Sequence, residues 1–406
     1  MDVNFGATYR IVDGLRSRRG FLPDQDLFDD ARGLGDHGLF SRLANLYRAF
    51  LQIGRGCEGL ASNMRIHYPK WLLYSAVVLL VLANVINIAA DLSAMGAAVG
   101  LLIPGPQELF VVMLGGLSVV LQIFVPYDRY ARLLKWPALA LLAYVAVALI
   151  VPIRWADVAQ AIVRPRVSLT SDYLTTVVAV LGTTISPYLF FWQASQEVEE
   201  MRSEPGQGPL RRVPHQAPAQ LRRINFDTWI GMGVSNVIAF FIVLTAAATL
   251  HVHHIDVKTS ADAARALEPI AGRFAYVLFA LGIIGTGLLA LPVLAGSAAY
   301  AAAGSFRWRS SLALHLTLAR EFYAVIALSI IGGVVITFMH FDPIRALYWS
   351  AVINGLAAVP IMVIMMLMAR SRRVMGQFAV RGILAWGGWL ATFAMAIAAV
   401  GMFVPG

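Results

Sequence analysis

The sequence predicts an all-α integral membrane protein, and three observations lead to that fold class. Hydrophobic residues make up 59% of the 406 residues, charged residues only 14%, and the mean hydropathy is +0.70. A water-soluble domain of this size cannot bury so much apolar surface. The apolar residues form continuous runs rather than alternating ones, which disfavours a β-barrel. We therefore expect a bundle of membrane-spanning helices.

Windows of about 20 residues, the length at which a helix crosses a bilayer, locate the expected spans. Nine apolar segments result, at 71–101, 107–125, 136–153, 174–194, 229–250, 272–303, 321–340, 343–369 and 386–404. The first and the sixth are long enough to tilt or to extend beyond the bilayer. We expect residues 71–404 to form one transmembrane domain.

Lysine and arginine predict the orientation of these spans. With residues 1–70 in the cytoplasm, roughly 25 basic residues fall on the inner side and about 7 on the outer side. This asymmetry explains the net charge of +9 better than a nucleic-acid partner does, and we expect no such partner. The sequence predicts a multi-pass protein of the inner (plasma) membrane with a cytoplasmic N-terminus.

Two polar segments flank or interrupt the spans. Residues 1–70 are basic, and 38–53 has the pattern of an amphipathic helix on a membrane surface. Residues 195–228 are polar, rich in proline and without periodicity. We expect residues 1–70 to be a cytoplasmic N-terminal segment and 195–228 a mobile cytoplasmic linker.

The stretch LGTTISPYLFFWQASQEVEE at 181–200 carries a proline where an apolar span should be continuous. Pro187 has no N–H, and its ring presses against the preceding turn. Together with Gly182 and the hydroxyls of Thr183 and Ser186, it predicts a kink or a short unwound segment. Carbonyl and hydroxyl oxygens exposed there would suit a cation, as in discontinuous transporter helices. A proline kink packed against a neighbouring helix fits the same residues.

Two more polar side chains lie within apolar spans. Asp91 is a lone acid in NVINIAADLSAMGAAVG, and such a carboxylate is by default a functional candidate. A structural hydrogen bond is the alternative. Asn354, in YWSAVINGLAAVP, could hold two helices together or offer an oxygen ligand.

Enzyme motifs do not appear in the sequence. Cys57 is the one cysteine, which excludes an internal disulfide and a multi-cysteine metal site. We find no zinc-protease motif, nucleophile elbow or phosphate-binding loop. The sequence therefore predicts neither an enzyme nor a resident cofactor.

Four stretches together resemble the Nramp family (natural resistance-associated macrophage proteins), which are proton-coupled divalent metal-ion transporters. They are LGTTISPYLFFWQASQEVEE, INFDTWIGMGVSN, FALGIIGTGLLALPVLAGSAAYAAA and FDPIRALYWSAVINGLAAVP. The resemblance covers roughly residues 53 to 404, with the motifs in the family's order and spacing. It implies a leucine-transporter-like bundle of two inverted repeats, in which the first and sixth helices unwind around the metal.

The resemblance assigns roles to several residues. It makes 174–194 the sixth helix and places Thr183 where a backbone carbonyl ligand is expected. Ser186-Pro187-Tyr188 stands where well-studied members have Met-Pro-His, so a hydroxyl replaces the thioether sulfur. Such an all-oxygen site suits hard divalent ions such as Mg²⁺ or Mn²⁺. Asp91 matches an acid that the family uses in proton movement.

One departure from the family concerns the first helix, whose Asp-Pro-Gly-Asn-type motif supplies a metal carboxylate. The similarity starts near IGRGCEGLASNMRIHYPKW, which resembles the loop after the second helix. We therefore expect an N-terminally truncated bundle of about nine spans, without the first two core helices.

The function expected from these residues is transport of a divalent metal ion of the Mn, Fe or Mg class into the cytoplasm. Thr183, Ser186 and Asn354 would bind the metal as a substrate, and Asp91 would handle protons if the transport is a symport. Two alternatives remain: a non-transporting truncated member of the family, and an amino-acid or organic-cation carrier of the same fold. The lipid bilayer, the metal ion and protons are the expected partners.

Overall fold

The computed structural model describes residues 59–125, 136, 139–163, 170–203, 208, 213–251, 259–267, 272–339 and 342–403. Within these ranges the chain consists of helices and contains no strand. Eight helical segments are long and apolar enough to cross a membrane. Most of the predicted N-terminal segment 1–70, including 38–53, lies outside the described residues.

Most of the long helices follow the expected spans closely, except that α11 and α12 extend well beyond them. They are α5 (Lys70–Gly100), α6 (Gln107–Phe124), α10 (Ser171–Thr184), α11 (Pro187–Ser203), α12 (Ala217–Ala246), α15 (Ala275–Phe306), α16 (Arg320–Thr337), α17 (Pro343–Arg370) and α19 (Ile383–Gly401). The shorter ones are α4 (Leu60–His67), α8 (Leu142–Ile150), α9 (Trp155–Val163), α13 (Ser260–Ala264) and α18 (Arg372–Met375). Helices α10 and α11 together form one of the eight spans.

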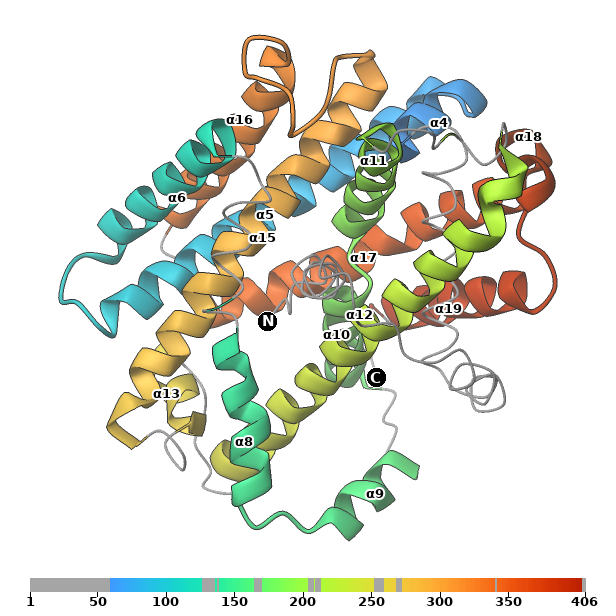
Figure 1. Ribbon diagram of the computed structural model, residues 1–406. Coiled ribbons are helices and arrows are strands. Elements are labelled where there is room, and N and C mark those ends of the chain that lie inside the picture. Colours follow the sequence, from blue (N-terminus) through green and yellow to red (C-terminus); the bar gives the residue numbers. More distant parts are fainter. Residues whose placement is uncertain are drawn as a thin grey trace, which may run out of the picture.

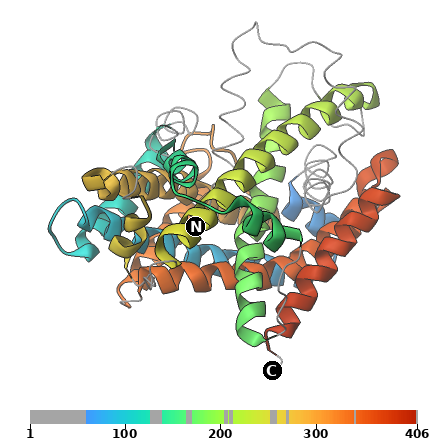
Figure 2. The ribbon, with the colours of Figure 1, turned by 90° about the horizontal axis from the view of Figure 1, so that it is seen from below.

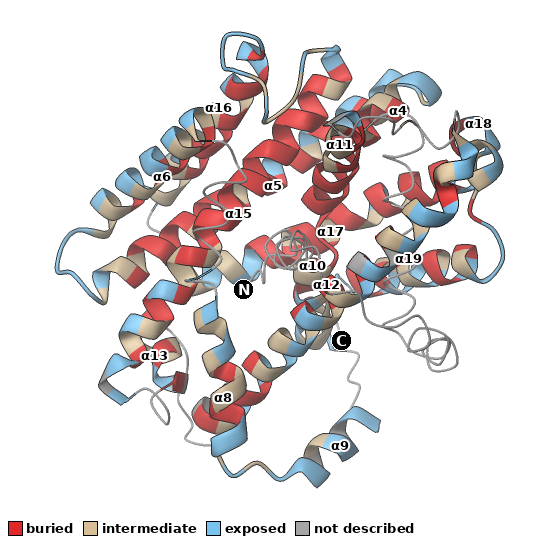
Figure 3. Ribbon diagram, viewed as in Figure 1, coloured by how far each residue is buried: buried red, intermediate tan, exposed pale blue. Residues whose placement is uncertain are grey.

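Helices α5, α15 and α17 form the centre of the bundle (Figure 1). Helix α5 packs against both of the others and also against α6 and α16. Figure 3 shows that buried residues dominate α5, α11, α15 and α17, whereas the outer helices are exposed along one side. The exposed sides are rich in large hydrophobic residues, as expected for surfaces that contact lipid.

The expected span at 136–153 is shorter than the other spans. Its described helical part runs over 139–150, as a 3₁₀ turn followed by α8. Twelve helical residues extend only about 18 Å, well short of a hydrocarbon core of about 30 Å. Helix α8 packs on α12, where the Thr245 hydroxyl donates to the Tyr144 carbonyl at 2.8 Å.

The prediction of a linker at 195–228 is wrong at both of its ends. Helix α11 continues to Ser203, and α12 begins at Ala217 after a 3₁₀ turn. Polar composition does not end a helix, because charged residues such as glutamate and arginine have high helix propensity. Glu200 on α11 and Arg223 on α12 form an ion pair, so the two helical extensions also contact each other.

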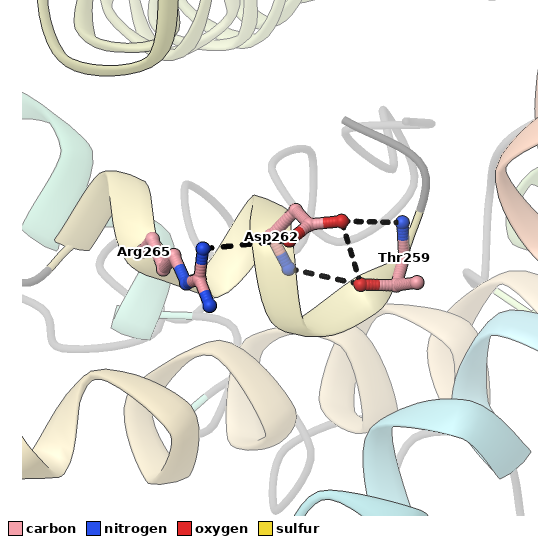
Figure 4. Close-up of polar contacts among 3 residues, drawn as sticks. All are labelled: Thr259, Asp262 and Arg265. Atoms are coloured by element: carbon pink, nitrogen blue, oxygen red, sulfur yellow. Dashed lines mark hydrogen bonds and ion pairs between the residues drawn. The ribbon is translucent and has the colours of Figure 1, made fainter. Parts of the chain in front are cut away.

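Helix caps mark two of the connections. Asp342 accepts hydrogen bonds from the N–H groups of Ile344, at 2.9 Å, and Arg345, at 3.4 Å, and so begins α17 just before Pro343. Thr259 and Asp262 form a capping box at the start of α13, with Arg265 3.7 Å from the Asp262 carboxylate (Figure 4).

The C-terminal helix lies beside the first half of the broken span. Figure 2 shows α10 next to α19, and the Ser171 hydroxyl donates to the Met402 carbonyl at 2.6 Å. Helix α10 is therefore held between α17 and α19.

Candidate metal-binding site at the helix break

The span that begins with α10 is divided at residues 185–186, which we call the helix break. The Ile185 N–H still bonds to the Leu181 carbonyl at 2.7 Å, but Ile185 has φ −118° and ψ 68°, outside the helical region. Helix α11 then starts at Pro187. Proline disfavours helical geometry in the residue before it, and it cannot donate to the Thr183 carbonyl. The break therefore leaves that carbonyl without its helical donor.

Three hydroxyl groups surround the break. Thr183 and Thr184 both donate to the Val180 carbonyl, at 2.8 and 3.1 Å, and Ser186 donates to the Gly182 carbonyl at 2.6 Å. Each hydroxyl thereby gives its proton to the backbone and keeps lone pairs on its oxygen. Ser186 is fully buried. The break thus offers neutral oxygen atoms, which are the ligand type that hard divalent cations prefer.

Helix α10 contacts α17 backbone to backbone just before the break. A Cβ added to Gly182 would lie 2.6 Å from the Gly355 nitrogen, and a Cβ added to Gly355 would lie 2.6 Å from the Val178 carbonyl oxygen. Real Cβ atoms essentially never approach so closely. Glycine at both positions is therefore what brings α17, and Asn354 beside Gly355, to the level of the break.

Asn354 itself faces α5. Its Nδ2 donates to Asn87 Oδ1 at 2.9 Å, and Asn87 Nδ2 donates to Asn354 Oδ1 at 2.7 Å. Both side chains are almost completely buried. The structure therefore brings Thr183 and Ser186 together at the break, and places Asn354 on the neighbouring helix in a pair with Asn87.

Sequence reasoning did not single out Asn87. The available signal was its position four residues before Asp91, which puts both side chains on one face of α5. Asn84 lies on the same face and donates to the Leu294 carbonyl at 2.9 Å and to the Ser297 hydroxyl at 2.7 Å. Asp91 is thus the last residue of a polar row along α5.

The structure also places Tyr188 and the metal-ligating residue types. Tyr188, in the first turn of α11, is buried and belongs to the main hydrophobic core. Among the described residues, no three histidine, cysteine, aspartate or glutamate side chains are grouped so that they could hold a metal ion. Within that part of the chain, the helix break is therefore the candidate site supported by backbone geometry.

The fold and the break define a class: a multi-helix integral membrane protein in which the span from α10 to α11 is discontinuous. The family model described as "Natural resistance-associated macrophage protein-like" matches residues 56–405. The chain belongs to the Nramp family.

Curated relatives carry the name divalent metal cation transporter MntH. The protein from Acidiphilium cryptum is 29% identical over 250 residues, which cover 60% of this chain and 52% of that protein. The one from Granulibacter bethesdensis is 22% identical over 256 residues, 62% of this chain and 55% of its own length. The one from Pectobacterium carotovorum is 25% identical over 346 residues, 83% of this chain and 77% of the relative. The chain thus spans about half the length of the first two relatives.

Among solved structures, the chain is similar to the Eremococcus coleocola manganese transporter in complex with an aromatic bis-isothiourea substituted compound. The TM-score is 0.71, and the match covers 89% of this chain and 77% of that one. The sequences are 17% identical, so this likeness concerns the fold. It confirms the leucine-transporter-like helical bundle that the sequence predicted.

Proposed function

We propose that this chain transports divalent metal ions across the plasma membrane through the helix break. The observation that carries the proposal is the break itself, where Pro187 leaves the Thr183 carbonyl without its helical donor and the Ser186 hydroxyl is buried beside it. Buried oxygens of this kind bind cations in discontinuous transporter helices. The names of the curated relatives and membership of the family support the same substrate class.

Thr183, Ser186 and Asn354 are the proposed metal ligands. The Asn354 oxygen already accepts a hydrogen bond from Asn87, but an amide oxygen has a second lone pair that can contact a cation. With carbonyl, hydroxyl and amide oxygens as donors, the site favours hard ions of the Mg²⁺ and Mn²⁺ class over soft ions such as Cd²⁺.

Asp91 is the proposed proton-handling group. It follows Asn87 by one helical turn on α5, so it lies close to the level of Asn354 without being one of the three proposed ligands. The basic loops favour an N-terminus in the cytoplasm. The proposed direction of transport is inward. The proposal includes no enzymatic activity, resident cofactor or nucleic-acid partner.

Uptake into proteoliposomes tests this function. The full chain is reconstituted with Mn²⁺ or Mg²⁺ outside and a pH-sensitive dye inside. We expect saturable uptake, with acidification of the interior, and we expect Asp91→Asn to abolish the acidification. No saturable flux of either ion from monodisperse, cooperatively unfolding protein would overturn the proposal in favour of a non-transporting protein.

A matched pair of variants tests the site. Ser186→Ala removes the buried hydroxyl at the break. Ser329→Ala removes an equally buried hydroxyl on α16, which donates to the Val325 carbonyl at 2.8 Å in the same back-bonded geometry. We expect the first variant to raise the half-saturating metal concentration about tenfold, equivalent to about 1.4 kcal/mol, and the second to leave it unchanged. Equal effects would remove Ser186 from the site.

A further inference from the structure

The two halves of the broken helix are attached to the bundle in different ways. Helix α10 contacts α17 through backbone atoms at Gly182 and Gly355, where no side chain fits between them. Helix α11 packs on α15, and there the contacts are made by side chains. Side-chain contacts can be broken and remade without moving either helix axis far. The break at residues 185–186 is the joint between the two halves.

Tyr300 on α15 is the centre of the side-chain contact. Trp192 meets the Tyr300 ring edge-on, with ring centroids 5.9 Å apart. One turn further along α11, Gln196 Nε2 donates to the Tyr300 hydroxyl at 3.3 Å. The hydroxyl in turn donates to Glu199 Oε1 at 2.6 Å. Spacings of four and three residues put these three side chains on one face of α11, along a single line of contact with Tyr300.

One turn before Tyr300 on α15, Trp192 also lies against Gly296. A Cβ on Gly296 would lie 2.4 Å from the nearest atom of the Trp192 ring, so the absence of a Cβ leaves room for the indole against α15. The contact therefore runs over about one turn of α15, from Gly296 to Tyr300, and about two turns of α11, from Trp192 to Glu199. It ends at the Glu199 carboxylate.

The groups around Glu199 come from several elements. Its carboxylate also meets the Ser311 side chain and the Leu312 backbone, in the segment that joins α15 to α16. That segment is fixed independently, because the Tyr323 hydroxyl on α16 donates to the Leu314 carbonyl at 2.9 Å. The charged and titratable groups that face Glu199 are Arg202 on α11, Tyr300 on α15 and Tyr323 on α16.

We propose that the hydrogen bond from Tyr300 to Glu199 holds α11 against α15 in the arrangement that the structure shows, which we call closed, and that it breaks when α11 turns about the helix break to release the metal ion. Tyr300 is then a positioning residue, because it acts on the metal path through α11. The inference rests on the proposed transport function. A hydrogen bond to a carboxylate is about twice as strong as a neutral one, so a single hydroxyl can hold the closed arrangement.

Removal of one oxygen atom tests this role. Tyr300→Phe deletes the hydroxyl but keeps the ring that packs on Trp192 and on Phe322, whose centroid is 4.9 Å away. Tyr323→Phe is the matched control, because it deletes a neighbouring hydroxyl that bonds to the α15–α16 segment and not to α11.

The reporter is a single cysteine on the packed side of α11. Val198, which is 5% exposed, is replaced by cysteine in a chain that also carries Cys57→Ser. Reaction of this cysteine with a water-soluble maleimide is followed in proteoliposomes. We expect Tyr300→Phe to increase the labelling rate at least about fivefold, equivalent to about 1 kcal/mol, and Tyr323→Phe to change it less than about twofold.

Variants of Glu199, the acceptor of this hydrogen bond, provide a second test. Glu199→Ala removes the acceptor and should increase labelling as Tyr300→Phe does. Glu199→Gln keeps an Oε1 that accepts from the Tyr300 hydroxyl, but the bond is then neutral and weaker, so this variant should label at a rate between those of the unmodified chain and Glu199→Ala. Equal labelling of Tyr300→Phe and Tyr323→Phe would overturn the inference. So would a reporter that reacts as fast in the unmodified chain as in urea-unfolded protein.

Manganese uptake separates this inference from the transport proposal. Tyr300 does not contact the proposed ligands, so Tyr300→Phe should change the maximal uptake rate and leave the half-saturating Mn²⁺ concentration unchanged. Labelling requires no metal flux. Absence of uptake by the unmodified chain would therefore overturn the transport proposal and the release of metal, but not the Tyr300–Glu199 contact that labelling measures. Unchanged labelling would overturn the role of Tyr300 alone.

Discussion

The side-chain amides of Asn87 and Asn354 are each other's partners: each donates to the other's Oδ1, at 2.7 and 2.9 Å, between α5 and α17. A reciprocal amide pair satisfies a donor and an acceptor on each helix at once. It therefore fixes both the distance and the register of the two helices next to the break. The same pair orients the Asn354 oxygen that we propose as a metal ligand.

We predict that Asn87→Ala and Asn354→Ala each lower the free energy of unfolding by about 0.5–2 kcal/mol, because each deprives the other buried amide of its partner on the facing helix. The double variant should lose less than the sum of the two, since neither amide is then stranded. Thermal or urea unfolding in detergent measures all three. Strict additivity would show that the pair contributes no coupling energy.

Gly182→Ala is predicted to separate α10 from α17. The new Cβ would meet backbone atoms of Gly355, which cannot rotate away, so we expect a loss of about 1–3 kcal/mol in unfolding free energy. Gly116→Ala on α6 is the control, because nothing lies within 4 Å of its Cβ position. An equal response of both variants, measured by unfolding in detergent, would contradict the close approach at Gly182.

Pro187→Ala is predicted to abolish transport and leave the chain folded. Alanine restores an N–H that can bond to the Thr183 carbonyl, which favours a continuous helix across the break. Metal uptake should fall more than about tenfold while helicity by circular dichroism does not decrease. Pro360→Ala serves as control, since Pro360 lies inside α17 without interrupting it. Full uptake by Pro187→Ala would show that the break is not required.

Ser186→Cys is predicted to change the ion preference, because it replaces a hard oxygen with a soft sulfur of similar shape. In a chain with Cys57→Ser, inhibition of Mn²⁺ uptake by Cd²⁺ should require about tenfold less Cd²⁺, equivalent to about 1.4 kcal/mol. Ser329→Cys on α16 controls for a buried thiol elsewhere. A strong preference for Cd²⁺ over Mg²⁺ in the unmodified chain would instead contradict the hard-ion assignment.

Much of the fold follows from local sequence properties. A long apolar run has to be helical in a bilayer, which is why six of the expected spans lie within a few residues of the observed helices. Pro187 likewise marks the helix break, because a missing N–H is a property of that residue in any context. Polarity was a poorer guide, since the polar ends of α11 and α12 are helical although the sequence suggested a linker there.

Contacts between distant residues were not predictable in this way. Asn87 and Asn354 are separated by 267 positions, and Glu199 and Tyr300 by 101. The sequence around one member of each pair does not identify the other member, because the pairing depends on how the helices cross. The sequence pointed to the oxygens at Thr183 and Ser186, but the pairing of Asn354 became visible only with α5 in place.

The backbone contact between α10 and α17 also has a genetic consequence. Every single-nucleotide change that alters a glycine codon to another amino acid adds at least a Cβ atom. At positions 182 and 355 that atom would collide with backbone of the facing helix. Neither codon is therefore one nucleotide away from a codon for another amino acid that would preserve the packing. Natural variation at these two positions is expected to be confined to synonymous changes.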